Sequence, residues 1–363
     1  MVEYNEQIAD IEAEIKKTQY NKATQHHIGL LKAKIAILKQ KQEARSKKSP
    51  GEGFAVRKSG DASAALVGFP SVGKSTILNR LTNAASKTAA YAFTTLTCIP
   101  GILNYKSAKI QILDIPGIIK GAAQGVGKGR EVIGVVRSSD LVIVVADITD
   151  LKQIEAIRGE LYDANIRLDE EPPQISIKPT PRGGLHISSH KKLTNIDKDT
   201  IVGILKQYRM LNGYVIVKED ITPDRLIDAL EGNRIFIPSL IVLNKVDLVP
   251  KEVAEKLAKQ YNAITISAAG NLGFDNFKDV IFDRLKLIRV YLKEYNKKAD
   301  TTEPLIMRSG TTIGDVCRKL HREFVEKFRY ARIWGKTAKY PGEKFQNLEL
   351  KLHDGDIIEI KLR

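Results

Sequence analysis

Apolar residues follow a helical spacing at the start of the chain. They fall three or four positions apart, which places them on one face of a helix. They are Ile8, Ile11 and Ile15, and then Ile28, Leu31, Ile35 and Leu38. Tyr20 to Thr24 is the expected break between two helices. We therefore expect residues 1–50 to form a helical hairpin, followed by a linker at Ser46 to Gly53, which contains Pro50 and two glycines.

From Ser59 onward, short apolar runs alternate with helical periods. The runs lie at 64–67, 110–113, 141–146, 240–243 and 263–266. Buried strands that alternate with helices predict an α/β domain, with a mostly parallel sheet and helices on both faces. We assign residues 60–165 and 238–290 to this domain.

The interval between the runs at 141–146 and 240–243 is too long for a simple connection inside one compact domain. It contains signals of its own. Residues 174–178 alternate like a strand, Gly183-Gly184 marks a turn, and the stretches 197–211 and 222–230 are helical, with Pro223 near the start of the second. We expect an inserted α+β domain over residues 166–237.

The pattern changes again near Thr302. Strands are predicted at 304–307 and 332–334, and two alternating strands at 348–352 and 357–362 are joined by a turn at 353–356. A helix is predicted from Ile313 to Phe328. Residues 302–363 therefore form a third, β-rich domain with one main helix.

The segment Gly68–Ser75 fits the phosphate-binding pattern G-x-x-x-x-G-K-[ST] at every fixed position, between a strand and a helix. Its residues are Gly68, Phe69, Pro70, Ser71, Val72, Gly73, Lys74 and Ser75, and Thr76 comes next. The glycines let backbone N–H groups point at phosphate oxygens, and the start of the helix adds partial positive charge. We expect Lys74 to reach the β and γ phosphates and the Ser75 hydroxyl to bind Mg²⁺.

Asp114-Ile115-Pro116-Gly117 follows the run at 110–113 in a D-x-x-G arrangement. Asp114 is expected to hold Mg²⁺ through water, and the Gly117 N–H to contact the γ-phosphate. The segment 91–96 lies where a switch loop belongs. We expect Thr95, rather than Thr94, to bind Mg²⁺ there when the γ-phosphate is present.

The motif that predicts the base follows the run at 240–243. Asn244-Lys245-Val246-Asp247 fits N-K-x-D. The Asp247 carboxylate can accept two hydrogen bonds from guanine, and adenine lacks that donor pair, so ATP would leave a buried carboxylate unpaired. Lys245 would cover the base. The last nucleotide loop is expected at Ser267, Ala268 and Ala269, where a backbone N–H would contact the guanine O6.

The chain is strongly basic, with 58 Lys and Arg against 43 Asp and Glu and a net charge of +15. This surplus favours a polyanionic partner, RNA or the ribosome rather than a membrane. Between Lys16 and Lys48 the only acidic residue is Glu43. This stretch is either a basic helix that docks on RNA or the solvated face of the hairpin. Two distant cysteines, Cys98 and Cys317, favour a reducing interior and packing roles.

The Phe93-Thr94-Thr95-Leu96 segment, the D-x-x-G motif and the glycine-rich run at 118–129 resemble the Obg superfamily of translation-factor (TRAFAC) GTPases. Within it, the N-terminal helices, the insert and the C-terminal domain resemble the developmentally regulated GTP-binding (DRG) family over nearly the whole chain. Obg proper begins with a glycine-rich domain that is absent here, and YchF-type relatives depart from N-K-x-D. The resemblance implies a P-loop GTPase fold, an insert shaped like the second domain of ribosomal protein S5, and a C-terminal ubiquitin-like TGS domain linked to ribosome and RNA contacts.

The residue after D-x-x-G weakens the case for fast catalysis. Ras-like switches place a water-orienting glutamine there, but this chain has Ile118, and Gln124 is too far along the loop to assign. We expect slow Mg²⁺-dependent GTP hydrolysis that uses Lys74, Thr95 and Gly117 and is accelerated by a protein activator, a cation or switch ordering. Some relatives hold K⁺ with an asparagine at the position of Ser71, so a potassium site is in doubt.

These observations predict a cytoplasmic, monomeric switch that binds GTP and GDP and acts in translation through the ribosome or RNA, without a membrane. The alternative is a ribosome- or RNA-binding scaffold in which GTP is structural. A phosphotransferase that uses the same phosphate loop is disfavoured, because it would have no use for N-K-x-D.

Overall fold

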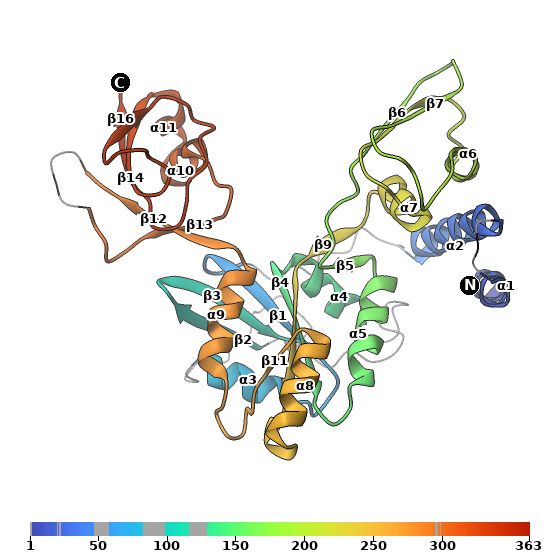
Figure 1. The fold of residues 1–363 in the computed structure, drawn as a ribbon, viewed down its shortest axis with the longest axis horizontal. Helices are drawn as coiled ribbons and strands as arrows, with labels where there is room; N and C mark the ends of the chain where they lie inside the picture. Colours follow the sequence, from blue (N-terminus) through green and yellow to red (C-terminus); the bar gives the residue numbers. More distant parts are fainter. Residues whose placement is uncertain are drawn as a thin grey trace. The chain divides into compact units, whose positions relative to one another are not determined.

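The structure is a computed structural model that describes residues 2–19, 21, 23–46, 58–82, 99–115, 129–294, 297 and 299–363 (Figure 1). The chain divides into two compact units. The first unit joins Met1–Gly53 to Glu170–Phe236, and the second joins Phe54–Asp169 to Ile237–Arg363. The N-terminal hairpin, expected as a separate domain, thus forms one unit with the insert.

A six-stranded sheet organises the second unit, in the order β11-β10-β4-β1-β3-β2. Its strands are β1 (Ala62–Val67), β2 (Ile99–Tyr105), β3 (Ala108–Asp114), β4 (Leu141–Asp147), β10 (Ser239–Asn244) and β11 (Ala263–Thr265). All pairs are parallel except β2 with β3. The sequence did not predict β2, which includes Pro100 and Gly101. An edge strand tolerates both residues.

Helices cover both faces of this sheet, as the α/β pattern predicted. They are α3 (Lys74–Leu81), α4 (Gly129–Ser138), α5 (Lys152–Asp163), α8 (Lys251–Tyr261) and α9 (Phe274–Arg284), with a short 3₁₀ turn η1 (Val246–Leu248). Ile77 of α3 and Phe277 of α9 pack on one face, beside Val145. Ile154 of α5 and Ala254 of α8 pack on the other face, beside the next residue of β4, Ala146. Successive residues of a strand point to opposite faces, so one apolar run serves both cores.

The same unit contains a second sheet near the C-terminus, in the order β13-β12-β16-β14-β15. Its elements are β12 (Leu287–Leu292), β13 (Leu305–Arg308), α10 (Ile313–Leu320), α11 (Arg322–Glu326), β14 (Phe328–Trp334), β15 (Glu343–Phe345) and β16 (Ile357–Leu362). The sheet begins at Leu287, inside the range expected for the α/β domain, because β12 pairs with both β13 and β16. Cys317 is buried in its core, as expected of a packing residue.

Two local predictions in this region are wrong. The single helix expected from Ile313 to Phe328 is interrupted at His321, whose backbone is extended, and Phe328 already belongs to β14. The stretch 348–352 is no strand. The carbonyl oxygens of Leu348 and Leu350 instead accept hydrogen bonds from Gly314 and Ile313 at the start of α10. The turn at 353–356 therefore does not join a hairpin, and β16 pairs with β14 and β12.

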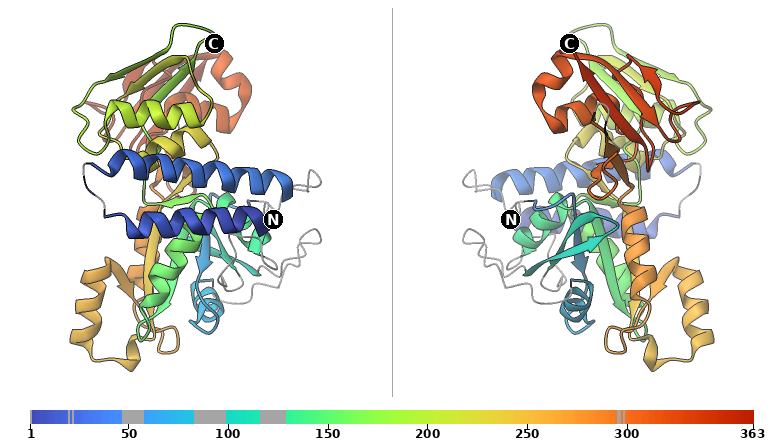
Figure 2. Two further views of the ribbon diagram at one scale, coloured as in Figure 1. Left: turned by 90° about the vertical axis from the view of Figure 1, so that its right-hand side faces the viewer. Right: turned by 90° about the vertical axis from the view of Figure 1, so that its left-hand side faces the viewer.

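The first unit combines helices with the three-stranded sheet β6-β8-β7. Its elements are α1 (Val2–Lys17), α2 (Gln25–Ser46), β6 (Ile175–Pro179), β7 (Leu185–Ser189), α6 (Lys198–Gln207), β8 (Gly213–Val217) and α7 (Pro223–Glu231). The short strands β5 (Ile166–Leu168) and β9 (Ile235–Ile237) stand at the two ends of the insert. Helices α1 and α2 run side by side (Figure 2), and Ile8, Ile11 and Leu38 form the seam between them.

Helix α2 packs closely on α6 and α7. Ala33 of α2 is buried in the core that these helices form with the sheet β6-β8-β7. At Gly29 of α2, an added Cβ would lie 2.9 Å from Cγ2 of Thr200 in α6, so the helices approach at a glycine. Lys32 forms an ion pair with Asp224 at 2.6 Å. Part of the basic helix is therefore committed to contacts inside the unit.

Candidate functional site

The predicted nucleotide residues that the structure describes lie at one edge of the six-stranded sheet. Gly68–Gly73 connects β1 to α3, the first turn of α3 contains Lys74–Thr76, and Asp114 ends β3. Asn244 ends β10, and Ser267, Ala268 and Ala269 follow β11. The carboxyl ends of parallel strands meet at this edge, which is where open α/β sheets bind ligands. Thr95 and Gly117, together with Ile118, Gln124 and Cys98, lie outside the described residues.

The phosphate loop is shaped by its two glycines. A Cβ at Gly68 would lie 2.5 Å from the carbonyl oxygen of Val145, so only glycine fits beside β4. Gly73 has φ of 94° and precedes α3 without a side-chain cap. The first N–H groups of α3 therefore have no capping side chain, which is the arrangement that binds phosphate at a helix start. Ser71 is also left-handed, with φ of 65°, and its side chain is exposed.

Lys74 is drawn inward over this loop. Its Nζ donates hydrogen bonds to the carbonyl oxygens of Gly68 at 3.0 Å and Phe69 at 2.9 Å. Burial lowers the pKa of Lys74, and the Asp114 carboxylate partly opposes that shift. A buried ammonium group partnered mainly by neutral carbonyls would gain from an anionic ligand. The geometry therefore suits a lysine that contacts phosphate.

Ser75 and Asp114 form the pair that could hold a metal ion. The Ser75 hydroxyl donates to Oδ2 of Asp114. Burial raises the pKa of Asp114, while the hydrogen bond from Ser75 and the charge of Lys74 lower it. Hydroxyl and carboxylate oxygens are ligands that Mg²⁺ accepts, and Mg²⁺ in nucleotide sites takes few protein ligands. The oxygen donors of this pair would therefore fit a Mg²⁺ ion that is shared with phosphate. The part of the chain that the structure describes contains no group of three or more His, Cys, Asp or Glu side chains placed for a metal.

Asn244 links the phosphate loop to the last nucleotide loop. It is buried, with 2% of its surface exposed. Its Nδ2 donates to the carbonyl oxygen of Val72 at 2.8 Å, and its Oδ1 accepts from the N–H of Ala268 at 3.0 Å. One side chain at the end of β10 thus fixes the loops that would contact the phosphates and the base.

Lys245 and Asp247 extend from the same turn. Lys245 has a left-handed backbone, with φ of 66°, and its Nζ lies 2.7 Å from Oδ2 of Asp147. Asp247 accepts a hydrogen bond from the hydroxyl of Ser267, which itself accepts from the N–H of Gly270 at 2.9 Å. The Asp247 carboxylate is thereby oriented from the side of the last loop.

Asp147 is a further candidate residue of this site, and the sequence motifs did not identify it. Burial would raise the pKa of Asp147, but hydrogen bonds from Lys245 and Thr149 bring it below its usual value. The carboxylate therefore stays charged and positions the lysine of N-K-x-D. The sequence does contain a sign of this residue, because Asp147 comes at the end of an apolar strand just as Asp114 does. A single aspartate fits no motif, however.

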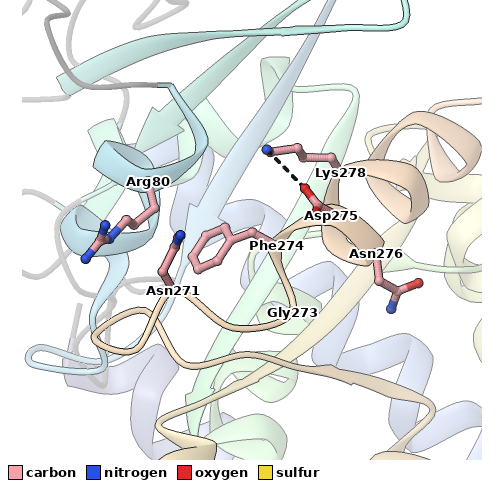
Figure 3. Close-up of a pocket in the computed structure, with 7 residues that line it drawn as sticks. All are labelled: Arg80, Asn271, Gly273, Phe274, Asp275, Asn276 and Lys278. Atoms are coloured by element: carbon pink, nitrogen blue, oxygen red, sulfur yellow. Dashed lines mark ion pairs between the residues drawn. The ribbon is translucent and has the colours of Figure 1, made fainter.

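A separate polar pocket lies next to these loops (Figure 3). It is lined by Arg80, Asn271, Gly273, Phe274, Asp275, Asn276 and Lys278. Arg80 of α3 also donates to the carbonyl oxygen of Ala269 at 3.5 Å. None of the residues that line this pocket is among the predicted nucleotide contacts.

Three family models match successive parts of the chain. They are described as "50S ribosome-binding GTPase", over residues 63–178, "C-terminal region of MMR_HSR1 domain", over residues 182–287, and "TGS domain", over residues 288–362. Together with the phosphate loop and the sheet, these matches define a P-loop GTPase with a C-terminal TGS domain.

The relatives are more specific. The chain is 52% identical over 365 residues to an uncharacterized GTP-binding protein of Methanocaldococcus jannaschii, covering 99% of this chain and 93% of the relative. It is 42% identical to human developmentally-regulated GTP-binding protein 2, covering 98% of both chains. A solved GTP-binding protein of Pyrococcus horikoshii matches with a TM-score of 0.44 at 17% identity, covering 83% of this chain and all of that one. The chain belongs to the developmentally regulated GTP-binding protein family.

Proposed function

We propose that this GTP-binding protein is a slow, Mg²⁺-dependent GTPase that acts as a switch in translation through the ribosome or RNA. The main observation in support of a switch is the link that Asn244 makes between Val72 and Ala268. Through it, the loops for the two ends of the nucleotide are ordered together. The net charge of +15 and the TGS domain support a polyanionic partner. We place this activity in the cytoplasm, where ribosomes and GTP occur together.

Each proposed contact has a role in this mechanism. Gly68–Thr76 would surround the phosphates, with Lys74 neutralising negative charge on the β and γ groups. Mg²⁺, when bound, would supply further charge neutralisation, and we assign it to Ser75, Thr95 and, through water, Asp114. The Gly117 N–H would contact the γ-phosphate, and Ser71 stands where some relatives use an asparagine to hold K⁺. At the other end, Asp247 would accept from guanine, with Lys245 over the base and Ala268 or Ala269 donating to O6.

Slow hydrolysis follows from the residue at position 118. An isoleucine cannot orient the attacking water, so the chain lacks at this point the group that speeds the reaction in Ras-like switches. A partner that orders the switch loops would supply the missing positioning. A turnover above about 1 s⁻¹ for the free protein, near the usual enzyme range, would contradict this proposal.

Base recognition can be tested by exchanging one atom of Asp247. In the Asp247→Asn variant an amide replaces the carboxylate, so guanine loses an acceptor, whereas xanthine offers a carbonyl that the amide can donate to. We expect GTP affinity to fall at least about tenfold, or ~1.4 kcal/mol, and xanthosine triphosphate affinity to rise. Binding of labelled GTP, ATP and xanthosine triphosphate measures this. A wild-type preference for ATP would remove the basis for guanine recognition.

A scaffold in which GTP is only structural is the second candidate, and Ile118 favours it. Co-sedimentation with ribosomes separates the two. A switch must bind ribosomes with different affinity when loaded with GDP and with a non-hydrolysable GTP analogue, because only differential binding shifts a two-state equilibrium. Equal co-sedimentation in both states, with nucleotide still bound, would establish the scaffold. Repeating the experiment without residues 302–363 tests the contribution of the TGS domain.

A further inference from the structure

The three-stranded sheet of the insert has one covered face and one open face. Ile177, Val215 and Ile187 share a row across the strands and pack into the core with α6 and α7. Figure 1 shows α7 between these strands and α2. The next row points the other way and consists of Lys178, Tyr214 and His186, all exposed. Nothing in the described part of the chain covers that row.

The open face carries two stacked rings. Tyr214, on the central strand β8, is 54% exposed. The ring of His186 lies 5.2 Å from it, centroid to centroid, and the planes are inclined by 19°. Nε2 of His186 is 2.9 Å from the carbonyl oxygen of Gly183. A carbonyl only accepts, so this nitrogen carries a hydrogen and the ring orientation is fixed. Two large rings left in water on rigid strands are a surface on which a further flat ring can stack.

The charge around these rings has one sign. Between residues 172 and 196 the sequence contains Lys178, Arg182, Lys191 and Lys192 and no Asp or Glu, and there is none between residues 200 and 218. Two acidic residues shortly after β8, Glu219 and Asp220, contact other residues instead of this face. Glu219 lies 2.7 Å from Arg225, and Asp220 accepts from Thr194 and Asn195. The face is therefore basic without internal neutralisation.

We propose that this open face is a binding site for single-stranded RNA, with one base stacked on the Tyr214–His186 pair and the adjoining phosphates contacted by Lys178 and Arg182. Aromatic side chains inside a basic surface are the features that bind unpaired nucleotides. The next row on the same open face, two residues along each strand, consists of Ser176, Ile216 and Ser188. Its apolar surface is too small for the core of a protein interface. The inference rests on the proposed RNA or ribosome contact and assigns a site for it in the insert.

The test uses the full-length protein and a fluorescein-labelled single-stranded RNA of about 12 nucleotides, followed by anisotropy. We expect Tyr214→Ala to weaken binding about 5- to 150-fold, the range for loss of one stacked base, and Tyr214→Phe to retain most of it. Replacing both Lys178 and Arg182 by Gln should lower the slope of log affinity against log salt by about 0.7 for each lost phosphate contact. Tyr162→Ala, at a tyrosine of α5 that is 45% exposed, is the matched control and should bind RNA normally.

Cross-linking locates the site independently of other RNA contacts in the chain. With 4-thiouridine in the oligonucleotide, we expect cross-linked peptides from 185–189 and 213–217. Normal RNA affinity of Tyr214→Ala, with cross-links only outside the insert, would overturn this inference and leave the proposed function intact. If the wild-type protein binds neither RNA nor ribosomes, both this inference and the proposed function are refuted. Binding to phosphatidylserine vesicles that Tyr214→Ala abolishes, with RNA binding unchanged, would assign the face to a membrane instead.

Discussion

Truncation of Asn244 should uncouple the two nucleotide loops. In the Asn244→Ala variant, the carbonyl oxygen of Val72 loses its donor at 2.8 Å and the N–H of Ala268 loses its acceptor at 3.0 Å. Both groups sit beside a residue that is 2% exposed. An unpaired buried polar group costs about 1–3 kcal/mol. The two together set an upper limit of about 6 kcal/mol, and entry of water would bring the loss in unfolding free energy to about 2–3 kcal/mol.

The affinity for nucleotide should also fall, because in this variant nucleotide binding must order two loops that are no longer linked. We expect the dissociation constant for GDP to rise about 10- to 100-fold, or ~1.4–2.8 kcal/mol, measured by titration with a fluorescent GDP analogue. Urea unfolding of the nucleotide-free protein gives the stability. The matched control is Asn212→Ala, which removes an acceptor 2.8 Å from the N–H of Gly184 in the other unit. It should lose stability without losing nucleotide affinity. Wild-type GDP affinity in Asn244→Ala would refute the proposed coupling.

Two further predictions concern packing and pH. Gly29→Leu should destabilise the first unit by about 1–3 kcal/mol, because the added Cβ would lie 2.9 Å from Thr200. Gly159→Leu is the control and should be neutral or stabilising, because nothing lies within 4 Å of its added Cβ. Urea unfolding of both variants measures the difference in stability. Burial raises the pKa of Asp114 above its usual 3.8, so the folded state binds its proton more tightly and loses stability as pH rises through that range. Asp114→Asn should therefore be more stable than wild type at pH 7 without nucleotide, with the difference fading towards pH 4. The opposite trend in unfolding free energy would contradict this assignment.

Local motifs allowed the positions of the candidate nucleotide loops in the fold to be predicted from sequence. Each loop is encoded by consecutive residues that follow a buried strand, as in Asn244–Asp247, so spacing alone places it at the carboxyl edge of the sheet. Asp147 escaped detection because its role depends on Lys245, which is far away in sequence. No local pattern distinguishes such an aspartate from an ordinary turn residue.

Strands whose pairing depends on distant partners were harder to predict. The alternation at 348–352 predicts a strand, but its carbonyl groups bond to the start of α10. The strand β8 carries an exposed tyrosine and received no prediction. In both cases the partner of the backbone, which the local sequence does not contain, decided the structure.

Because α2 packs on the insert, the N-terminal hairpin cannot complete its folding until the insert has been synthesised. Gln25 donates to the carbonyl oxygen of Asn195, 170 residues later in the chain, and Ala33 is buried only once α6 and α7 exist. At about 5–20 residues per second, synthesis of the next 170 residues takes about 9 to 34 s, and the hairpin lacks its partner until then. During that time the face of α2 that contains Ala33 has no partner in the chain and is exposed to solvent.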